Sequence, residues 1–241
     1  MRTHRAVLAL MSALLLLLIP TPASASGAAP VPTPDPVWAA GGHGSARVVP
    51  PWSRYAGRTY GQWGAEWWRW ALEIPGSVNP LTDPTGARCG IDQSGPVWFL
   101  AGTFGAGSAS RTCTLPAGKA LFSPIINGFY AERPGVLTYK QLRQELRESI
   151  DLDNATYEAT LDGRRLRLSK AFRAASPPPP FRFTLPEDNI FEAPEAAGPY
   201  EGVSDGYWVL LKPLRRGTHV LTFHGTAPGV DVSVRYRLIV K

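Results

Sequence analysis

Four tryptophans within eight residues, Trp63, Trp67, Trp68 and Trp70, constrain what this chain can fold into. When the stretch is wound at 100° per residue, three of these indoles share one arc, and the charged side chains lie on the opposite arc. Each buried indole removes roughly 150–250 Å² of surface from water, so a large part of the chain must cover this arc. The sequence therefore predicts a Trp-rich helix over about 59–74 that packs as part of a core.

Both predicted helices begin with the same signal. Thr59 with Gln62, and Thr138 with Gln141, fit the capping box, in which a threonine hydroxyl and a glutamine amide satisfy free backbone N–H groups. The second segment, about 138–150, carries only a narrow apolar stripe, and its other side chains are charged or polar. This pattern predicts a surface helix that packs on one side.

The rest of the chain is rich in turns and in short alternating stretches. Glycine and proline each occur 24 times in 241 residues, which favours many short strands over long helices. Apolar and polar residues alternate along 230–240, and 155–168 reads as a hairpin with Asp162 and Gly163 in its turn. We therefore expect a mainly β fold, an antiparallel β-sandwich of immunoglobulin-like or jelly-roll type, with the Trp-rich helix packed on its sheets.

Three further stretches complete this prediction. The continuous apolar run at 96–104 predicts a strand in the centre of a sheet. The apolar stretch 119–126 predicts another strand, with a bulge or an edge position at Pro124 because proline lacks a backbone N–H. Residues 187–206 hold several carboxylates among glycines and prolines, and we interpret them as a long acidic loop.

The N-terminus has the features of a secretory signal peptide. A positively charged start precedes the apolar run 6–19, and a small-residue cleavage signature ends at Ala25. The run is shorter than the roughly 20 apolar residues that span a bilayer. We predict a signal peptide at 1–25, a Pro/Gly-rich leader at 26–51 and a single β-rich domain at 52–241. The mature protein is then secreted and extracellular, with no membrane span.

Cys89 and Cys113 are the two cysteines of the chain, and both lie in the part predicted to be exported. In an oxidising compartment this even count predicts a disulfide, which closes a loop of about 25 residues and contributes roughly 3.5 kcal/mol. Two thiolates are too few for a structural zinc site, and the sequence holds no complete calcium or nucleotide motif. We expect no metal and no cofactor.

The charge of the chain bears on its partners. Removal of the two arginines in 1–25 leaves 23 basic and 19 acidic residues, a formal charge of +4. This charge permits attraction to anionic envelope polymers. Because the basic residues do not cluster in a run, we expect no nucleic-acid partner.

Two resemblances to known proteins concern the fold. The chain resembles an uncharacterised family of exported bacterial proteins in the stretches Trp67–Trp70, Gly95–Phe99 and Gly118–Phe122. Its last strands resemble those of immunoglobulin-like β-sandwiches in secreted bacterial proteins, through Tyr207–Leu214, Gly217–His219 and the closing strand with Tyr236. Neither resemblance implies a reaction, so no catalytic residues carry over.

Tryptophans outside the centre of the apolar arc are candidates for a binding site. Indole faces stack on sugar rings, so Trp68, Trp98 and Trp208 are candidate ligand-binding residues of a glycan groove. The helical period of the Trp cluster instead favours packing in a core. Trp68 lies off the centre of the arc and is the best candidate for exposure.

Glu66 is the carboxylate that best fits a catalytic role. It lies at the border of the polar arc, beside two indoles, where a carboxyl group can serve as a general acid. Two carboxylates that flank a sugar form the site of many glycosidases, and Asp188 and Asp205 are candidates for the second group. The alternative is that Glu66 pairs with Arg69 or Arg54.

Two hypotheses of function follow from these features. The absence of a complete catalytic motif and the wealth of aromatic residues favour a secreted, non-enzymatic module that binds envelope polysaccharide or another exported protein. The alternative is a secreted glycan-active hydrolase that uses Glu66 with an acidic-loop carboxylate.

Overall fold

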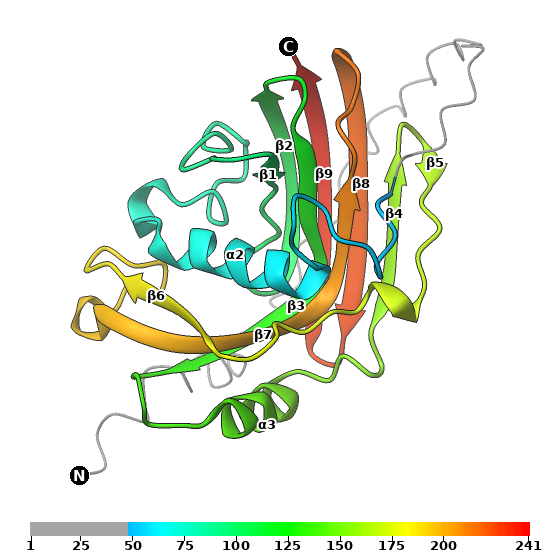
Figure 1. Cartoon of the computed structure of the whole chain (residues 1–241). Coiled ribbons are helices and arrows are strands. Elements are labelled where there is room, and N and C mark those ends of the chain that lie inside the picture. Colours follow the sequence, from blue (N-terminus) through cyan, green and yellow to red (C-terminus); the bar gives the residue numbers. More distant parts are fainter. Residues whose placement is uncertain (1–47) are drawn as a thin grey trace, which may run out of the picture. The chain divides into compact units, whose positions relative to one another are not determined.

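The computed structural model describes residues 48–241, which belong to one unit built from two β-sheets and two α-helices (Figure 1). The predicted signal peptide and the predicted leader as far as residue 47 lie outside the described residues. The elements are α2 (Tyr60–Glu73), β1 (Val97–Phe99), β2 (Gly107–Leu115), β3 (Ala120–Glu132), α3 (Tyr139–Ser149), β4 (Thr156–Leu161), β5 (Arg164–Arg165), β6 (Phe181–Leu185), β7 (Gly198–Leu211), β8 (Gly217–Ala227) and β9 (Val230–Val240).

The strands form a four-stranded sheet in the order β1-β3-β7-β6 and a five-stranded sheet in the order β2-β9-β8-β4-β5. These sheets, with one Trp-rich helix and one surface helix, confirm the expected mainly β, sandwich-like fold. Most neighbouring strands are antiparallel, but β1 is parallel to β3 and β2 is parallel to β9. Side-chain alternation reports which face of a strand is buried and says nothing of its direction, so the sequence did not predict the parallel pairs.

The apolar stretch at 96–104 does not lie in the centre of a sheet, and that prediction is wrong. Only Val97–Phe99 pair with β3, and β1 is the edge strand of its sheet. The run is apolar on both faces because it serves two cores. Trp98 packs between the sheets, whereas the ring of Phe99 lies 6.1 Å from that of Trp63 in α2.

The predicted acidic loop at 187–206 is also wrong in part, because residues from Gly198 onward form the first half of β7. Glycines and acids hide the apolar alternation of this strand. Its acids are held by arginines from other segments: Glu201 accepts from Arg182 of β6 at 2.9 Å, and Asp205 pairs with Arg143 of α3 at 3.0 Å. These contacts between distant residues stabilise a strand that its own sequence does not indicate.

One long edge of β7 is covered by three separate segments. β6 pairs with the first part of the strand. Farther along, the N–H groups of Ala174 and Ser176 donate to β7 carbonyls at 2.9 Å each, and the N–H of Val49 donates to Leu210 at 2.8 Å. Val48 and Val49, at the end of the predicted leader, therefore form part of the sheet edge.

Both helices begin where the sequence predicts. Thr59 is the N-cap of α2 and Thr138 is the N-cap of α3, each with both hydrogen bonds of its capping box. The helices cover the same sheet from opposite sides, α2 above β7 and α3 beneath it in the view of Figure 1. Their different surroundings decide how much of each helix is buried.

α2 packs on the four-stranded sheet through rings. The ring of Trp67 lies 5.8 Å from that of Trp208 in β7, and Trp208 stacks on Phe122 of β3 with centroids 5.1 Å apart. Gly64 allows this approach, because a Cβ at that position would lie 3.0 Å from Cζ2 of Trp208. We call the rings between α2 and the four-stranded sheet the aromatic layer. The burial of these indoles confirms the core expected from the helical pattern.

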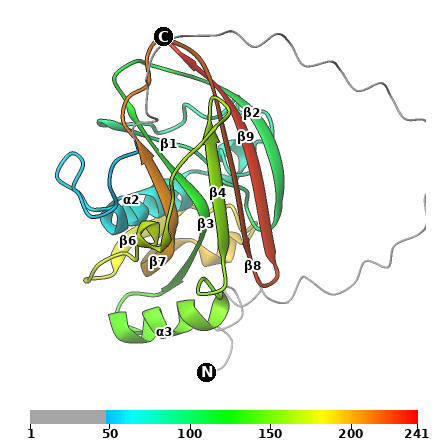
Figure 2. The ribbon, with the colours of Figure 1, turned by 90° about the vertical axis from the view of Figure 1, so that its right-hand side faces the viewer.

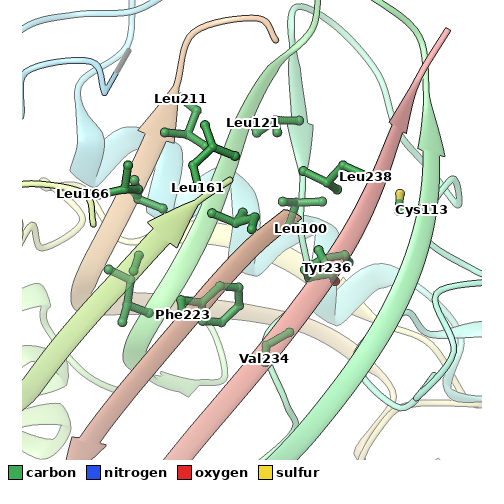
Figure 3. Packing of buried hydrophobic residues seen from close by; sticks show 14 of the residues in the cluster. Leu100, Cys113, Leu121, Leu161, Leu166, Leu211, Phe223, Val234, Tyr236 and Leu238 are labelled. Carbon is green, nitrogen blue, oxygen red and sulfur yellow. The ribbon is translucent and has the colours of Figure 1, made fainter. Parts of the chain in front are cut away.

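A second core lies between the two sheets and is mostly aliphatic. Figure 3 shows Leu121 and Leu211 of the four-stranded sheet beside Phe223, Tyr236 and Leu238 of the five-stranded sheet. Each of these five side chains is at least 98% buried. Inward residues alternate along the whole of β9, as the sequence predicts for 230–240.

The segment between α2 and β2 is held by the expected disulfide and by a buried arginine. Cys89 is bonded to Cys113 of β2. The guanidinium of Arg111, 3% exposed, donates to the backbone carbonyls of Asp83, Ala101 and Gly102 at 2.6–2.9 Å. Carbonyl oxygens thus satisfy this cation, which ties two parts of a long loop to the sheet.

Two local predictions also hold. Asp162 and Gly163 have φ angles of 51° and 75°, as the turn between β4 and β5 requires, and the N–H of Leu166 donates to Ala159 at 2.8 Å. The register of β3 with β7 shifts between Pro124 and Ile126, so Pro124 marks a bulge.

Candidate functional site

The three tryptophans proposed as ligand-binding residues are buried. Trp68 is 7% exposed, Trp98 is 9% exposed and Trp208 is fully buried. Trp98 belongs to the core between the sheets, whereas Trp68 and Trp208 belong to the aromatic layer. The structure therefore does not bring these indoles together on one open surface.

Glu66 takes part in ion pairs on the solvent side of α2. Its Oε2 accepts a hydrogen bond from Nη1 of Arg69 at 2.6 Å, and its Oε1 lies 3.7 Å from Nε of Arg58. The carboxylate is about one-third exposed. Pairing with Arg69 is the structural alternative that the sequence suggested, and the pairing with Arg58 was not foreseen.

Neither candidate for the second carboxylate lies beside Glu66. Asp188 accepts hydrogen bonds from the N–H and the hydroxyl of Ser77, a residue that follows the end of α2. Glu66 lies eight residues before Ile74, the C-cap of α2, and this distance corresponds to about 12 Å of helix. Asp205 lies on the opposite face of the four-stranded sheet, where Arg143 of α3 pairs with it. Glycosidase carboxylates lie roughly 5–10 Å apart across one sugar, and this arrangement does not resemble such a pair.

Asp205 is the buried centre of an ion cluster that joins α3 and the segment at Arg173 to β7. Its Oδ2 lies 3.0 Å from Nη2 of Arg143 and 3.1 Å from Nη2 of Arg173, and Arg173 also pairs with Asp153. Its Oδ1 accepts from the N–H of Gly206 at 2.8 Å. With both oxygens engaged, this carboxylate holds α3 and the segment at Arg173 against β7.

Burial also governs the titration of the phenols near the cores. Burial raises the pKa of Tyr60, although a hydrogen bond from the N–H of Leu210 partly offsets this rise. Burial likewise raises the pKa of Tyr236, which lies beside the Arg111 guanidinium. Each hydroxyl donates to a backbone carbonyl, to Val49 and Ala101 respectively, so both groups are structural. Within residues 48–241, no three His, Cys, Asp or Glu side chains come together as ligands for a metal.

The outer face of the five-stranded sheet carries many polar side chains. Inward positions of β2, β8 and β9 are buried, whereas the alternating outward positions are exposed or half-buried. In Figure 2 the other coloured elements lie on one side of this sheet. We call its outward hydroxyl-bearing and arginine side chains the hydroxyl–arginine face: Ser108, Ser110, Thr112, Thr114, Thr156, Thr160, Thr218, Thr222, Thr226, Ser233, Arg235 and Arg237.

The strand register arranges this face in rows. One row across four strands runs through Ser110, Arg235, Thr222 and Thr160. Neighbouring strands lie about 4.8 Å apart, so the row is about 14 Å long. The hydroxyls of Thr160 and Thr222 lie 2.7 Å apart, and Arg237 lies in the next row.

The charges on the face are not evenly distributed. The ion pairs within residues 48–241 do not include Arg235 or Arg237. At the other end of the sheet, His224 lies 3.0 Å from Asp231 and 3.9 Å from Glu158. The two guanidinium groups therefore lie in the half of the face that also holds Thr222 and Val220, whereas the outward acids of β4 and β9, Glu158 and Asp231, lie in the other half.

Sequence analysis missed this face although its signal was present. The alternation along 230–240 predicts which side of the strand is buried. The same alternation places Ser233, Arg235 and Arg237 on one outward line. Only the pairing of β9 between β2 and β8 shows that hydroxyl groups flank the whole line on the β2 side and that Thr222 flanks Arg235 on the β8 side.

Comparisons with known proteins add little to this geometry. No protein-family model matches the chain, and no curated protein matches it. Among solved structures, the crystal structure of the cysteine protease inhibitor EhICP2 from Entamoeba histolytica is 12% identical, over 55% of this chain and 86% of that chain, with a TM-score of 0.20. A TM-score this low carries no inference. No helix within residues 48–241 has the length and hydropathy needed to cross a membrane.

Proposed function

We propose that this protein is secreted and acts as a non-enzymatic module that binds an anionic polysaccharide of the cell envelope through the hydroxyl–arginine face. The proposal rests on Arg235, which lies in a row of hydroxyls, and on Arg237, which lies beside Thr112, because both arginines are outside the ion pairs of the described residues. A guanidinium presents a planar fork of donors that matches a carboxylate or phosphate group. Serine and threonine hydroxyls both donate and accept, as hydroxyls of a sugar require.

A polysaccharide fits this surface better than a protein partner does. Protein interfaces have an apolar centre enriched in aromatic residues. The outward positions of β9 instead read Asp231, Ser233, Arg235, Arg237 and Ile239. A polar polymer finds hydrogen-bonding groups along such a face. The outward aliphatic side chains of β8 and β9 are Val220 and Ile239, so a protein partner would meet a mainly polar surface.

Export is part of the proposal and rests on separate features. The N-terminal segment 1–25 has the composition of a signal peptide, and the disulfide between Cys89 and Cys113 suits an oxidising compartment. The resemblances to exported bacterial proteins and to immunoglobulin-like sandwiches agree with this location. The hydrolase alternative receives no comparable support, because Glu66 is paired with Arg58 and Arg69, and Asp188 and Asp205 are held by Ser77 and Arg143.

Isothermal titration calorimetry of the mature chain, residues 26–241, tests the proposal with three polymers. Polygalacturonate supplies carboxylates, poly(glycerol phosphate) supplies phosphates, and dextran is neutral. We expect binding to at least one anionic polymer, weakening as salt rises, and none to dextran. The first two polymers distinguish the source of the negative charge.

Matched variants locate the binding surface. The double variant R235Q/R237Q removes two charges from the face and should weaken binding about ten-fold or more, because charge-assisted hydrogen bonds are lost. The control K140Q/R147Q removes two charges from the exposed side of α3 and should change affinity much less. Equal losses of affinity in both variants would show that binding depends on net charge and not on the hydroxyl–arginine face. An absence of binding to either anionic polymer would refute the proposal.

A further inference from the structure

Three buried polar groups in or beside the aromatic layer lack a hydrogen-bond partner. They are Nε1 of Trp68, Nδ2 of Asn127 and Oγ of Ser204. The Trp68 side chain is at least nine-tenths buried, and Ser204 is fully buried. Buried polar atoms are almost always hydrogen-bonded in folded proteins, so three such groups in one region need an explanation.

The strand register places the three groups close together. Phe129 of β3 is opposite Ser204 of β7, and Asn127 lies two residues before Phe129, on the same face of the strand. The ring of Phe129 contacts that of Trp68, with centroids 4.2 Å apart. This contact shows that Asn127 and Ser204 lie on the face of the sheet that α2 covers.

Partly exposed phenyl rings continue from this region toward the surface. The ring of Phe191 lies 6.3 Å from that of Phe129 and 5.6 Å from that of Phe104. All three phenylalanines are half-buried, in contrast to the closed rings around Trp67. The rings that adjoin the unpaired groups are therefore more exposed than the rings around Trp67.

The loop that carries Phe191 is held in a fixed geometry. Oδ1 of Asn189 accepts from the N–H of Phe191 at 3.1 Å, and its Nδ2 donates to the carbonyl of Ala193 at 2.6 Å. Asn189 is 2% exposed and organises the loop from inside. Rings presented by a rigid support need less ordering when a ligand binds.

We propose that Trp68, Asn127 and Ser204 form the polar end of a binding site for a small neutral aromatic molecule that carries a carbonyl oxygen, with Phe129 and Phe191 in contact with its ring. An indole N–H, an amide N–H and a hydroxyl can all donate to a carbonyl oxygen. The three groups are neutral, which favours a neutral acceptor over a carboxylate, whose buried charge would need a cation. The site is separate from the hydroxyl–arginine face, which lies on the other sheet.

The experiment compares two probes of similar shape. Coumarin has two fused rings and a carbonyl oxygen, whereas naphthalene has two fused rings and no hydrogen-bond acceptor. In ¹H–¹⁵N NMR spectra of the mature chain, coumarin should shift the Trp68 indole N–H resonance in a saturable manner and bind at least about ten-fold more tightly than naphthalene. The resonance is assigned by its loss in the variant W68F.

Matched variants decide whether the polar groups bind the probe. W68F keeps a ring and removes the N–H, and N127A removes the amide at a less buried position; each should lose most of the preference for coumarin, measured by line broadening of the probe. The control is W98F, because the Trp98 Nε1 is also buried and without a partner but belongs to the core between the sheets. W98F should bind coumarin as the parent chain does.

The contrary outcomes are distinct. If coumarin causes no saturable shift of the Trp68 resonance, the proposal is overturned, and water alone reaches these groups. Equal binding of coumarin and naphthalene, or equal losses in W68F and W98F, would also overturn it. A folded N127A variant that retains the full preference for coumarin would also overturn the proposal, which places Asn127 at the polar end.

Discussion

The two helices start from the same capping box and end in opposite environments. Ten of the fourteen residues of α2 are buried, whereas two of the eleven residues of α3 are buried. The aromatic rings of α2 pack against aromatic rings of the four-stranded sheet. α3 instead packs a narrow aliphatic stripe against the sheet, beside an ion cluster. The comparison shows that local signals set where a helix begins, and that the matching surface sets how much the helix contributes to stability.

The largest expected effect comes from the buried face of α2. We expect Trp67→Ala to lower the free energy of unfolding by about 4 kcal/mol, because it removes the ring packed on Trp208 and leaves a cavity. Leu146→Ala in α3 should cost about 2–3 kcal/mol. Urea unfolding followed by tryptophan fluorescence measures both. If the α3 variant loses as much as the α2 variant, the two helices do not differ in the way proposed.

The ion cluster should contribute more to the attachment of α3 than surface charges would. Asp205→Asn should destabilise the protein by about 3 kcal/mol, because it leaves Arg143 and Arg173 without their shared carboxylate. Hydrogen exchange should then be faster in α3 than in α2. A variant as stable as the parent chain would show that this pair contributes no more than an exposed one.

The capping boxes offer a comparison at equal chemistry. Thr59→Ala and Thr138→Ala each remove one cap and should each cost about 1 kcal/mol. The first variant should lower the stability of the whole domain, whereas the second should mainly increase hydrogen exchange at the start of α3. A purely local effect at both positions would mean that the burial of α2 does not link its cap to the core.

The smallest effect is expected at Glu66. Glu66→Gln should cost less than about 1 kcal/mol, because the group is partly exposed and its pairs with Arg58 and Arg69 are accessible to solvent. Thermal unfolding measures this change, with Arg69→Gln as the partner control. If Glu66→Gln abolished a glycan hydrolysis activity of the parent chain while leaving its melting temperature unchanged, the hydrolase alternative would replace the binding function.

Of the three polar groups in the proposed site for an aromatic molecule, the sequence draws attention to Trp68 but not to Asn127 or Ser204. The off-centre position of Trp68 on the helical arc predicts an exposed indole, whereas the structure buries this indole against the half-buried Phe129. Asn127 and Ser204 could not be identified, because no spacing along the chain links two strands that lie 77 residues apart in sequence. The hydroxyl–arginine face escaped for the same reason, since its rows run across strands and not along them.

The amino-acid sequence by itself determined the features that depend on neighbours a few residues apart: both helix starts, the turn at Asp162 and Gly163, the bulge at Pro124 and the alternation of β9. It also indicated the disulfide, since the chain holds two cysteines. Tertiary structure decided the parallel pairs, the edge position of β1 and the strand formed by 198–206. These features depend on contacts between residues that are distant in sequence. The free energy that stabilises them comes from the burial of surfaces that meet only in the folded chain.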